Sequence, residues 1–181
     1  KLRSFITSDA QRDNFVSNLY DTTYEVINKG VDNIVIIDDS IVRGTTLEKS
    51  IIKMLDKLGP KKIVIVSSAP QIRYPDCYGI DMSKVKEFVA FRAMLELLKE
   101  TKQENLLDSV LEKCKASIND LSGNTINHVK ELYAPFSYEQ VSSKIGEIVT
   151  PKDCNAEIQV VYQTVENLHR SCPNHLGDWY F

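Results

Sequence analysis

The chain has 181 residues, of which 43% are hydrophobic and 26% are charged, and its formal net charge is −3. This is the balance of a globular domain with a core of its own, and a net charge of −3 provides no long-range attraction to nucleic acid or to anionic membranes. No apolar run approaches the roughly 20 residues of a membrane-spanning helix. We therefore expect neither nucleic acid nor a membrane as a partner.

The four cysteines (Cys77, Cys114, Cys154 and Cys172) are widely spaced and form no CxxC pair. This usage is typical of a reducing compartment, where lone thiols are mostly small buried hydrophobes. We expect a cytoplasmic protein without disulfides. There is no signal-peptide pattern, and the absence of an initiator Met predicts that the chain is cut from a longer one.

The first elements follow from hydrophobic patterning. Residues 1–30 are polar and mixed, which favours a loop or a short helix. Val31–Asp38 is rich in Ile and Val and predicts a strand buried on both faces. Apolar residues then recur at helical spacing from Thr46 to Leu58, and Gly59-Pro60 ends that helix.

Lys61–Ser67 predicts a second strand, and two strands joined by one helix form a right-handed unit with parallel pairing. The long loop after it, Ser68–Asp81, contains two prolines and a glycine, and a loop of this length is often functional. Further helices are predicted at Val85–Glu100, Glu104–Ser117, Tyr138–Ile148 and Val165–His169, with a short strand at Glu157–Tyr162. The shift in composition near residue 82 divides the chain into a sheet-containing part, 1–82, and a mostly helical extension, 83–181.

Two carboxylates stand at the end of the first predicted strand. In open α/β sheets ligands bind beyond the carboxyl ends of the strands, and the segment after Asp38 and Asp39 runs into a helix. Carboxylates accept from sugar hydroxyls or bind Mg²⁺, while backbone N–H groups and hydroxyls donate to a phosphate. A phosphorylated sugar needs both kinds of group, and the segment supplies them from Asp38, Asp39, Ser40, Arg43, Gly44, Thr45 and Thr46.

Other loop types fit less well. The GxxxxGK[ST] spacing of the Walker loop is absent, and a single glycine excludes the dinucleotide fingerprint. A helix N-cap with incidental acidic residues is the plain structural alternative, which the strand before the loop and the helix after it disfavour.

The stretch "VIIDDSIVRGTT", Val35–Thr46, resembles the 5-phosphoribosyl-1-pyrophosphate (PRPP) loop of type I phosphoribosyltransferases. "SSAPQIRYPDCYGIDM", Ser67–Met82, is similar to the segment after the next strand in amidophosphoribosyltransferases, and "RSFI", Arg3–Ile6, resembles the start of their flexible catalytic loop. The resemblance implies an α/β chain with part of the type I phosphoribosyltransferase fold, a parallel sheet flanked by helices, and a helical C-terminal extension.

The resemblance also implies roles for individual residues. Asp38 and Asp39 would hold the ribose hydroxyls of PRPP and contribute to a Mg²⁺ site. Residues 43–46, with Ser40, would surround the 5′-phosphate, largely through backbone N–H groups. The family reaction transfers ammonia, released from glutamine, to PRPP and gives 5-phosphoribosylamine and pyrophosphate, which is the first step of de novo purine nucleotide synthesis.

In that family a separate domain with an N-terminal cysteine releases the ammonia, whereas this chain starts with Lys1-Leu2. We therefore expect a C-terminal fragment that completes neither half-reaction alone. For the full-length enzyme, the resemblance implies a homo-oligomer that purine nucleotides inhibit by feedback.

Some relatives carry an iron–sulfur cluster on cysteines. Here Cys172 and His175 have the spacing of a CxxC pair with one thiolate replaced, and Cys77 and Cys154 are further thiols. Four good ligands are not evident, so we expect neither a cluster nor a zinc site. Arg73 and Tyr74 of the long loop fit a contact with phosphates or a base, although exposure alone also explains the arginine. Arg3 and Arg12 fit a contact with pyrophosphate or, equally simply, a solvated surface.

Two other functions fit the loop. One is a phosphoribosyltransferase that acts on a nucleobase or on orotate, although the segment 67–82 and the helical extension argue against it. The other is a regulatory module that binds PRPP without turnover, for which a basic DNA-binding segment would be support.

Overall fold

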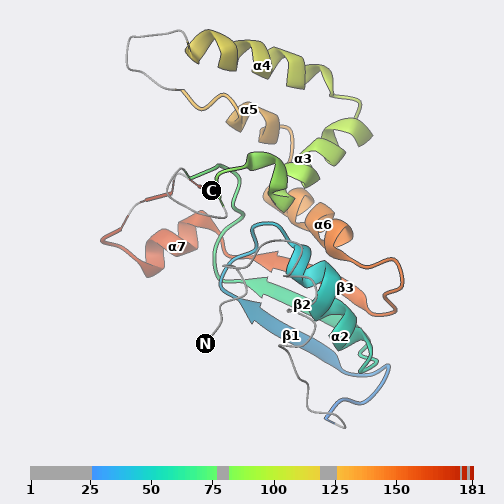
Figure 1. Ribbon diagram of the computed structural model, residues 1–181. Helices are drawn as coiled ribbons and strands as arrows, with labels where there is room; N and C mark the ends of the chain where they lie inside the picture. Colours follow the sequence, from blue (N-terminus) through green and yellow to red (C-terminus); the bar gives the residue numbers. More distant parts are fainter. Residues whose placement is uncertain (1–25, 77–81, 119–125, 176, 179) are drawn as a thin grey trace.

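The computed structural model describes residues 26–76, 82–118, 126–175, 177–178 and 180–181. Its centre is a three-stranded parallel sheet of β1 (Asn33–Asp38), β2 (Lys62–Ser67) and β3 (Glu157–Tyr162), in the order β1-β2-β3. Helices flank this sheet (Figure 1). The α/β class and the parallel pairing predicted from the sequence are confirmed.

The segment after β1 becomes helical where the apolar spacing predicts it. It contains a π-helical turn, η2 (Leu47–Ile51), followed by α2 (Ile52–Asp56). The wide turn is visible in the bond from the Ile52 N–H to the Leu47 carbonyl, five residues back. The predicted stop is confirmed at Gly59, which has a φ of +75°, a conformation that costs glycine little.

The next predicted helix is interrupted near its start. A 3₁₀ turn, η3 (Val85–Glu87), precedes α3 (Val89–Glu100), and the extended Phe88 (ψ 130°) separates them. The interruption has a cause in the tertiary structure, because the N–H of Val89 donates to the Val42 carbonyl at 2.8 Å. A bond to a distant loop thus replaces the continued helical turn.

The remaining elements build outward from the sheet. α6 (Tyr138–Val149) packs on β3 and α3 packs on α6. α4 (Asn105–Ile118) and the short α5 (Lys130–Tyr133) lie farthest from the sheet, at the top of Figure 1. α7 (Val165–Ser171) follows β3. The four-residue α5 was not predicted, because so short a helix leaves no periodic pattern.

The sheet has one deeply buried face and one that is partly exposed. The buried face carries Ile63 and Ile65 of β2 and Val160 of β3, whereas Val35 is 60% exposed and Ile37 is 78% exposed on the other face. The prediction that β1 is buried on both faces is therefore wrong. Right-handed crossovers that advance in one direction across a sheet place their helices on the same face, and α2 and α6 follow this rule.

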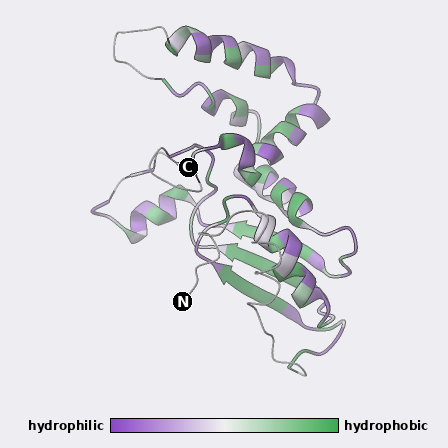
Figure 2. Ribbon diagram, in the orientation of Figure 1, coloured by the Kyte–Doolittle hydropathy of each residue, from purple (hydrophilic) through white to green (hydrophobic). Residues whose placement is uncertain are grey.

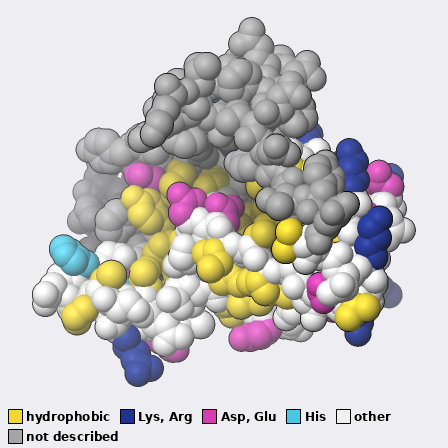
Figure 3. Space-filling view, turned by 90° about the horizontal axis from the view of Figure 1, so that it is seen from below, with side chains coloured by type: hydrophobic (Ala, Val, Ile, Leu, Met, Phe, Trp, Pro, Cys, Tyr) yellow, Lys and Arg dark blue, Asp and Glu magenta, His cyan; other side chains and the backbone are white. Residues whose placement is uncertain are grey.

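The hydropathy colouring shows the middle of β1 and of β2 in green, whereas β3 also has hydrophilic positions (Figure 2). Hydrophobic side chains also gather at the centre of the surface seen from below in Figure 3, on the side where β1 lies in Figure 1. The second face of the sheet thus offers apolar area that no described helix covers.

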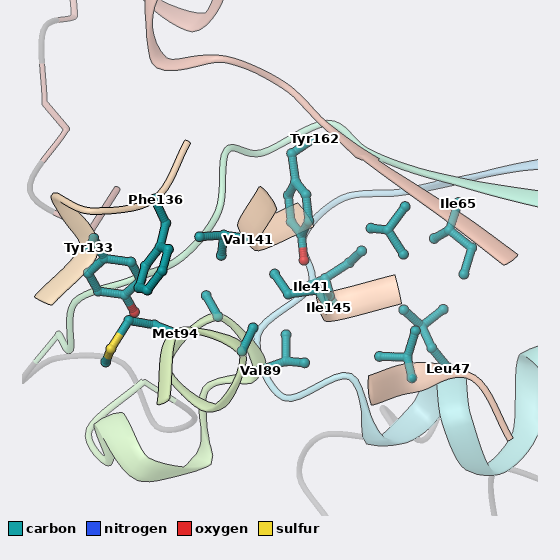
Figure 4. Packing of buried hydrophobic residues seen from close by; sticks show 14 of the residues in the cluster. Ile41, Leu47, Ile65, Val89, Met94, Tyr133, Phe136, Val141, Ile145 and Tyr162 are labelled. Atoms are coloured by element: carbon teal, nitrogen blue, oxygen red, sulfur yellow. The ribbon is translucent and has the colours of Figure 1, made fainter. Parts of the chain in front are cut away.

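The core joins the sheet to the helices and to the segment after β1. Figure 4 shows Ile41 and Leu47 of that segment pointing toward Ile65 of β2 and Ile145 of α6. Ile41 and Leu47 are each only 3% exposed. The two apolar residues therefore fix the position of the loop that lies between them.

A single carboxylate connects the end of α2 to the start of β3. Oδ1 of Asp56 accepts hydrogen bonds from the backbone N–H groups of Asn155 (3.0 Å) and Ala156 (2.8 Å), and Oδ2 accepts from the Asn155 side chain. Burial raises the pKa of the Asp56 carboxyl. The hydrogen bonds lower it by a larger amount, so the net shift is downward. Asp56 therefore holds two segments about a hundred residues apart.

Candidate functional site

The candidate site begins with the two aspartates at the carboxyl end of β1. Asp38 is the last residue of β1, and its Oδ1 accepts the N–H of Asp39 at 3.0 Å. Oδ1 of Asp39 in turn accepts the N–H of Ser40 at 2.7 Å. Each carboxylate thus uses one oxygen to hold the turn of the backbone, and the carboxyl groups of Asp38 and Asp39 lie close enough to interact with each other.

The start of the loop after β2 is hydrogen-bonded to the backbone of the two aspartates. The N–H groups of Ser68 and Ala69 donate to the carbonyls of Asp38 (2.9 Å) and Asp39 (3.0 Å), and the Ser68 hydroxyl also donates to the Asp38 carbonyl. Sequence reasoning did not assign Ser68 or Ala69 a role. The signal was present, because neighbouring parallel strands end at the same edge of the sheet.

The electrostatics of the pair are unfavourable without a cation. Burial, followed by the negative charge of Asp39, raises the pKa of the Asp38 carboxyl above its usual range. No cationic side chain of a described residue forms an ion pair with either aspartate. A cation beside the two carboxylates would relieve this repulsion.

The loop then turns over the helices α3 and α6. The Val42 carbonyl accepts from Val89 at the start of α3, and Gly44 adopts a φ of +74°. A Cβ on Gly44 would lie 2.8 Å from Cγ1 of Val149, so that one of the two would have to shift, and 3.4 Å from Cγ2 of Val89, which is an ordinary contact. The glycine predicted for close backbone approach is needed here for packing as well as for its conformation.

Backbone donors gather at the end of the loop. The N–H groups of Gly44, Thr45 and Thr46 donate to no other residue in the part of the chain that the structure describes. Free N–H groups before a helix favour an anion. Arg43 contributes differently from its neighbours, because its guanidinium forms an ion pair with Glu87 at 2.8 Å.

The predicted residues therefore lie together in one continuous loop. Carboxylate oxygens stand at its start with the Ser40 hydroxyl next to them in sequence, and the unused N–H groups stand at its end, where Thr45 and Thr46 also carry hydroxyls. Hard oxygen donors are the ligands that Mg²⁺ prefers, and this ion usually keeps waters and shares substrate phosphates. The donor set of Asp38 and Asp39 fits Mg²⁺ bound in that way.

The side chain of Arg73 lies in a cage formed by Tyr133, Tyr138 and Gln71. Its guanidinium lies 4.6 Å from the ring centroid of Tyr133 and 4.9 Å from that of Tyr138, and it donates to Oε1 of Gln71. Tyr74 is buried and stacks edge-on against Tyr133. These contacts give Arg73 and Tyr74 a structural role in the loop after β2, which the sequence did not predict.

The described thiols do not converge. Cys154, before β3, lies 3.5 Å from Oδ1 of Asp56, while Cys172 follows α7 beyond the other end of the strand. His175 donates its backbone N–H to the Cys172 carbonyl. Among the described residues no three His, Cys, Asp or Glu side chains are placed to hold a metal ion.

Several sequence predictions fall outside the described residues. These are the flexible-loop resemblance at Arg3–Ile6, the contact by Arg12, the thiol of Cys77 and the motif Tyr78-Gly79-Ile80-Asp81. In the described part of the chain, no helix combines the length and apolar composition that a membrane crossing requires.

Comparison with known proteins identifies relatives of parts of the chain. No protein-family model matches the chain. Curated amidophosphoribosyltransferases do match parts of it. The one from Pasteurella multocida is 42% identical over 87 residues, covering 48% of this chain and 17% of the relative. The one from Escherichia coli is 52% identical over 58 residues, covering 32% and 11%.

A relative from the yeast Lachancea kluyveri is 36% identical over 111 residues, which is 55% of this chain and 22% of the relative. The chain thus spans about a fifth or less of the length of the curated relatives that it matches. Over these partial stretches, the resemblance of this chain to amidophosphoribosyltransferases is confirmed.

Proposed function

We propose that residues 38–46 form the PRPP-binding loop of an amidophosphoribosyltransferase. The observation that carries the proposal is the arrangement of the loop, in which two carboxylates and three unused N–H groups flank one turn at the carboxyl end of β1. The names of the matched relatives point to the same enzyme.

The two ends of the loop would bind different parts of PRPP. Asp38 and Asp39 would accept hydrogen bonds from the ribose hydroxyls through their second oxygens. The N–H groups of Gly44, Thr45 and Thr46 and the nearby hydroxyls would donate to the 5′-phosphate. Arg43 would act indirectly, because its ion pair with Glu87 holds the loop against η3.

Asp38 and Asp39 would also hold Mg²⁺, which, when bound, would offset the negative charge of the leaving pyrophosphate. The carboxylates would favour positive charge developing on the ribose ring as the bond to pyrophosphate breaks. In this proposal the chain's residues bind and orient the substrate and stabilise charge, with no covalent intermediate on the protein.

The whole protein would use glutamine-derived ammonia as the nucleophile and act in the first step of purine nucleotide synthesis. We further propose a cytoplasmic homo-oligomer that purine nucleotides inhibit by feedback, and a division of this chain near residue 82. The group that receives the phosphoribosyl unit distinguishes this function from transfer to a nucleobase or to orotate, and the relatives compared above carry the name amidophosphoribosyltransferase, which agrees with an amino-group acceptor.

Calorimetric titration of PRPP with Mg²⁺ into this chain tests the loop. We expect binding by the wild-type chain and its loss in the double variant Asp38→Asn/Asp39→Asn, with unchanged circular dichroism. Asp153→Asn, at the far end of the sheet, is the matched control and should bind as the wild type does. No binding by the folded wild-type chain, or equal binding by the double variant, would overturn the proposal.

A further inference from the structure

The outer edge of β3 leaves backbone groups without partners. Glu157 and Gln163 direct their N–H groups at β2, since they donate to the carbonyls of Lys61 and Ser67. N–H groups alternate in direction along a strand, so those of Ile158, Val160 and Tyr162 point away from β2, as do their carbonyls. None of these groups bonds to another residue in the described parts of the chain.

A groove of about 500 Å³ runs along this edge, between β3 and α6. Its helix side consists of five residues of α6, which are Tyr138 and Glu139 at the start of the helix and Ser142, Ser143 and Gly146 one and two turns later. Gly146 lies close to the backbone of β3, since a Cβ there would stand 3.9 Å from the Ile158 carbonyl oxygen. The small residues Ser142, Ser143 and Gly146 therefore leave room beside the edge for another strand.

The edge lacks the features that normally block strand addition. β3 contains no proline and no lysine, and it pairs with β2 over all six residues without a bulge. Proteins usually protect long edge strands, or pair them, because unpaired backbone groups recruit other chains. This edge is therefore suited to main-chain pairing.

We propose that β3 pairs with β3 of a second copy of this chain, antiparallel and about a two-fold axis at Val160. In this register Ile158 faces Tyr162 of the second copy, and Val160 faces its own equivalent. On the other face of the sheet Glu157 would lie opposite Gln163, so that no like charges meet. The interface is self-complementary, as a two-fold dimer requires, and all six free backbone groups gain partners.

The dimer would form one six-stranded sheet with the α6 helices side by side over its centre. Because the paired strands run in opposite directions, the two candidate loops would lie at opposite ends of this sheet. Each loop would remain open to its own substrate, so dimerisation does not depend on what the loop binds.

Sedimentation velocity over a range of concentrations tests the pairing with two matched variants. Ser143→Trp fills the groove from an exposed helical position, while Ser109→Trp makes the same change on an exposed position of α4. We expect dimers for the wild type and for Ser109→Trp, and monomers for Ser143→Trp with an unchanged melting temperature.

Hydrogen exchange gives an independent readout. In the wild-type dimer the amides of Ile158, Val160 and Tyr162 should exchange slowly, and in Ser143→Trp they should exchange at least tenfold faster. A monomeric wild type would overturn the proposal, and slow exchange in that monomer would assign the edge to another segment of the same protein. A dimer that Ser143→Trp leaves intact would also overturn it.

Discussion

Gly44 and Val149 approach so closely that a Cβ on the glycine would stand 2.8 Å from Cγ1 of the valine. Gly44→Ala adds this overlap to the strain of a φ of +74°, so we expect a loss of about 2–4 kcal/mol in the free energy of unfolding. Urea denaturation measures it. PRPP binding should weaken as well, because the loop must shift away from α6.

Gly30 offers a control for this prediction. It has a φ of +71°, and a Cβ there would meet nothing within 4 Å. Gly30→Ala should therefore cost only about 1–2 kcal/mol, the conformational part. Equal losses in the two variants would show that packing against Val149 has no effect.

Asp38→Asn should separate stability from binding. The pKa of Asp38 is raised by burial and by the charge of Asp39, so its ionised form disfavours the folded state. The penalty is absent at low pH, develops as the pH rises through the ordinary value of 3.8 toward the raised folded pKa, and is complete above it.

At pH 7 the variant should then be more stable than the wild type by up to about 1 kcal/mol, a small value because water screens this half-exposed group. The gain should vanish below pH 3. Thermal unfolding from pH 2.5 to 7 measures it, with Asp153→Asn as the control. A variant less stable than the wild type at pH 7 would contradict the repulsion between the carboxylates.

Asp56 should have the opposite pH dependence. Hydrogen bonds from residues 155 and 156 outweigh burial and lower the pKa of Asp56, so its contribution is present above the ordinary value of 3.8 and is lost as the pH falls through the lower folded value. Asp56→Asn places an amide against the Asn155 side-chain amide, and we expect a cost of about 1–2 kcal/mol at pH 7.

Urea midpoints of the wild type and Asp56→Asn should converge between pH 4 and pH 2. If the difference stayed constant across this range, the ionised carboxylate would not be the group that stabilises the start of β3.

Arg73→Lys should destabilise the loop after β2. A lysine cannot stack flat between Tyr133 and Tyr138 or donate two bonds to Gln71, so we expect a loss of about 1–2 kcal/mol. Chemical denaturation measures it, and Arg170→Lys, an exposed change of the same type on α7, should have no effect. Equal stability of the two variants would show that the contacts of Arg73 with Tyr133, Tyr138 and Gln71 do not stabilise the fold.

The sequence predicted most of the elements because their signals are local. The run of Ile and Val in β1, the helical spacing after Thr46 and the stop at Gly59-Pro60 each lie within a few residues of the element that they define. The loop residues from Asp38 to Thr46 could be chosen for the same reason, since one strand end and one helix start are adjacent in the chain.

The errors depend on residues far apart in sequence. The exposure of Ile37 follows from the face on which α2 and α6 pack, and the break at Phe88 follows from a bond to Val42. Ser68 contacts Asp38 across thirty residues of sequence, and it could have been found only from the predicted parallel pairing, which places the ends of the two strands side by side. No periodicity in one segment reports these contacts.

The order of the strands also predicts how the chain folds. Residues 39–61 separate β1 from β2, whereas residues 68–156 separate β2 from β3. This roughly fourfold longer connection adds only about 1 kcal/mol of loop-closure entropy, but that entropy is lost before the pairing contacts form. β1 and β2 should therefore pair first. In pulse-labelled refolding, amides at the β1–β2 boundary should become protected before those at β2–β3, and simultaneous protection would show that all three strands assemble in one step.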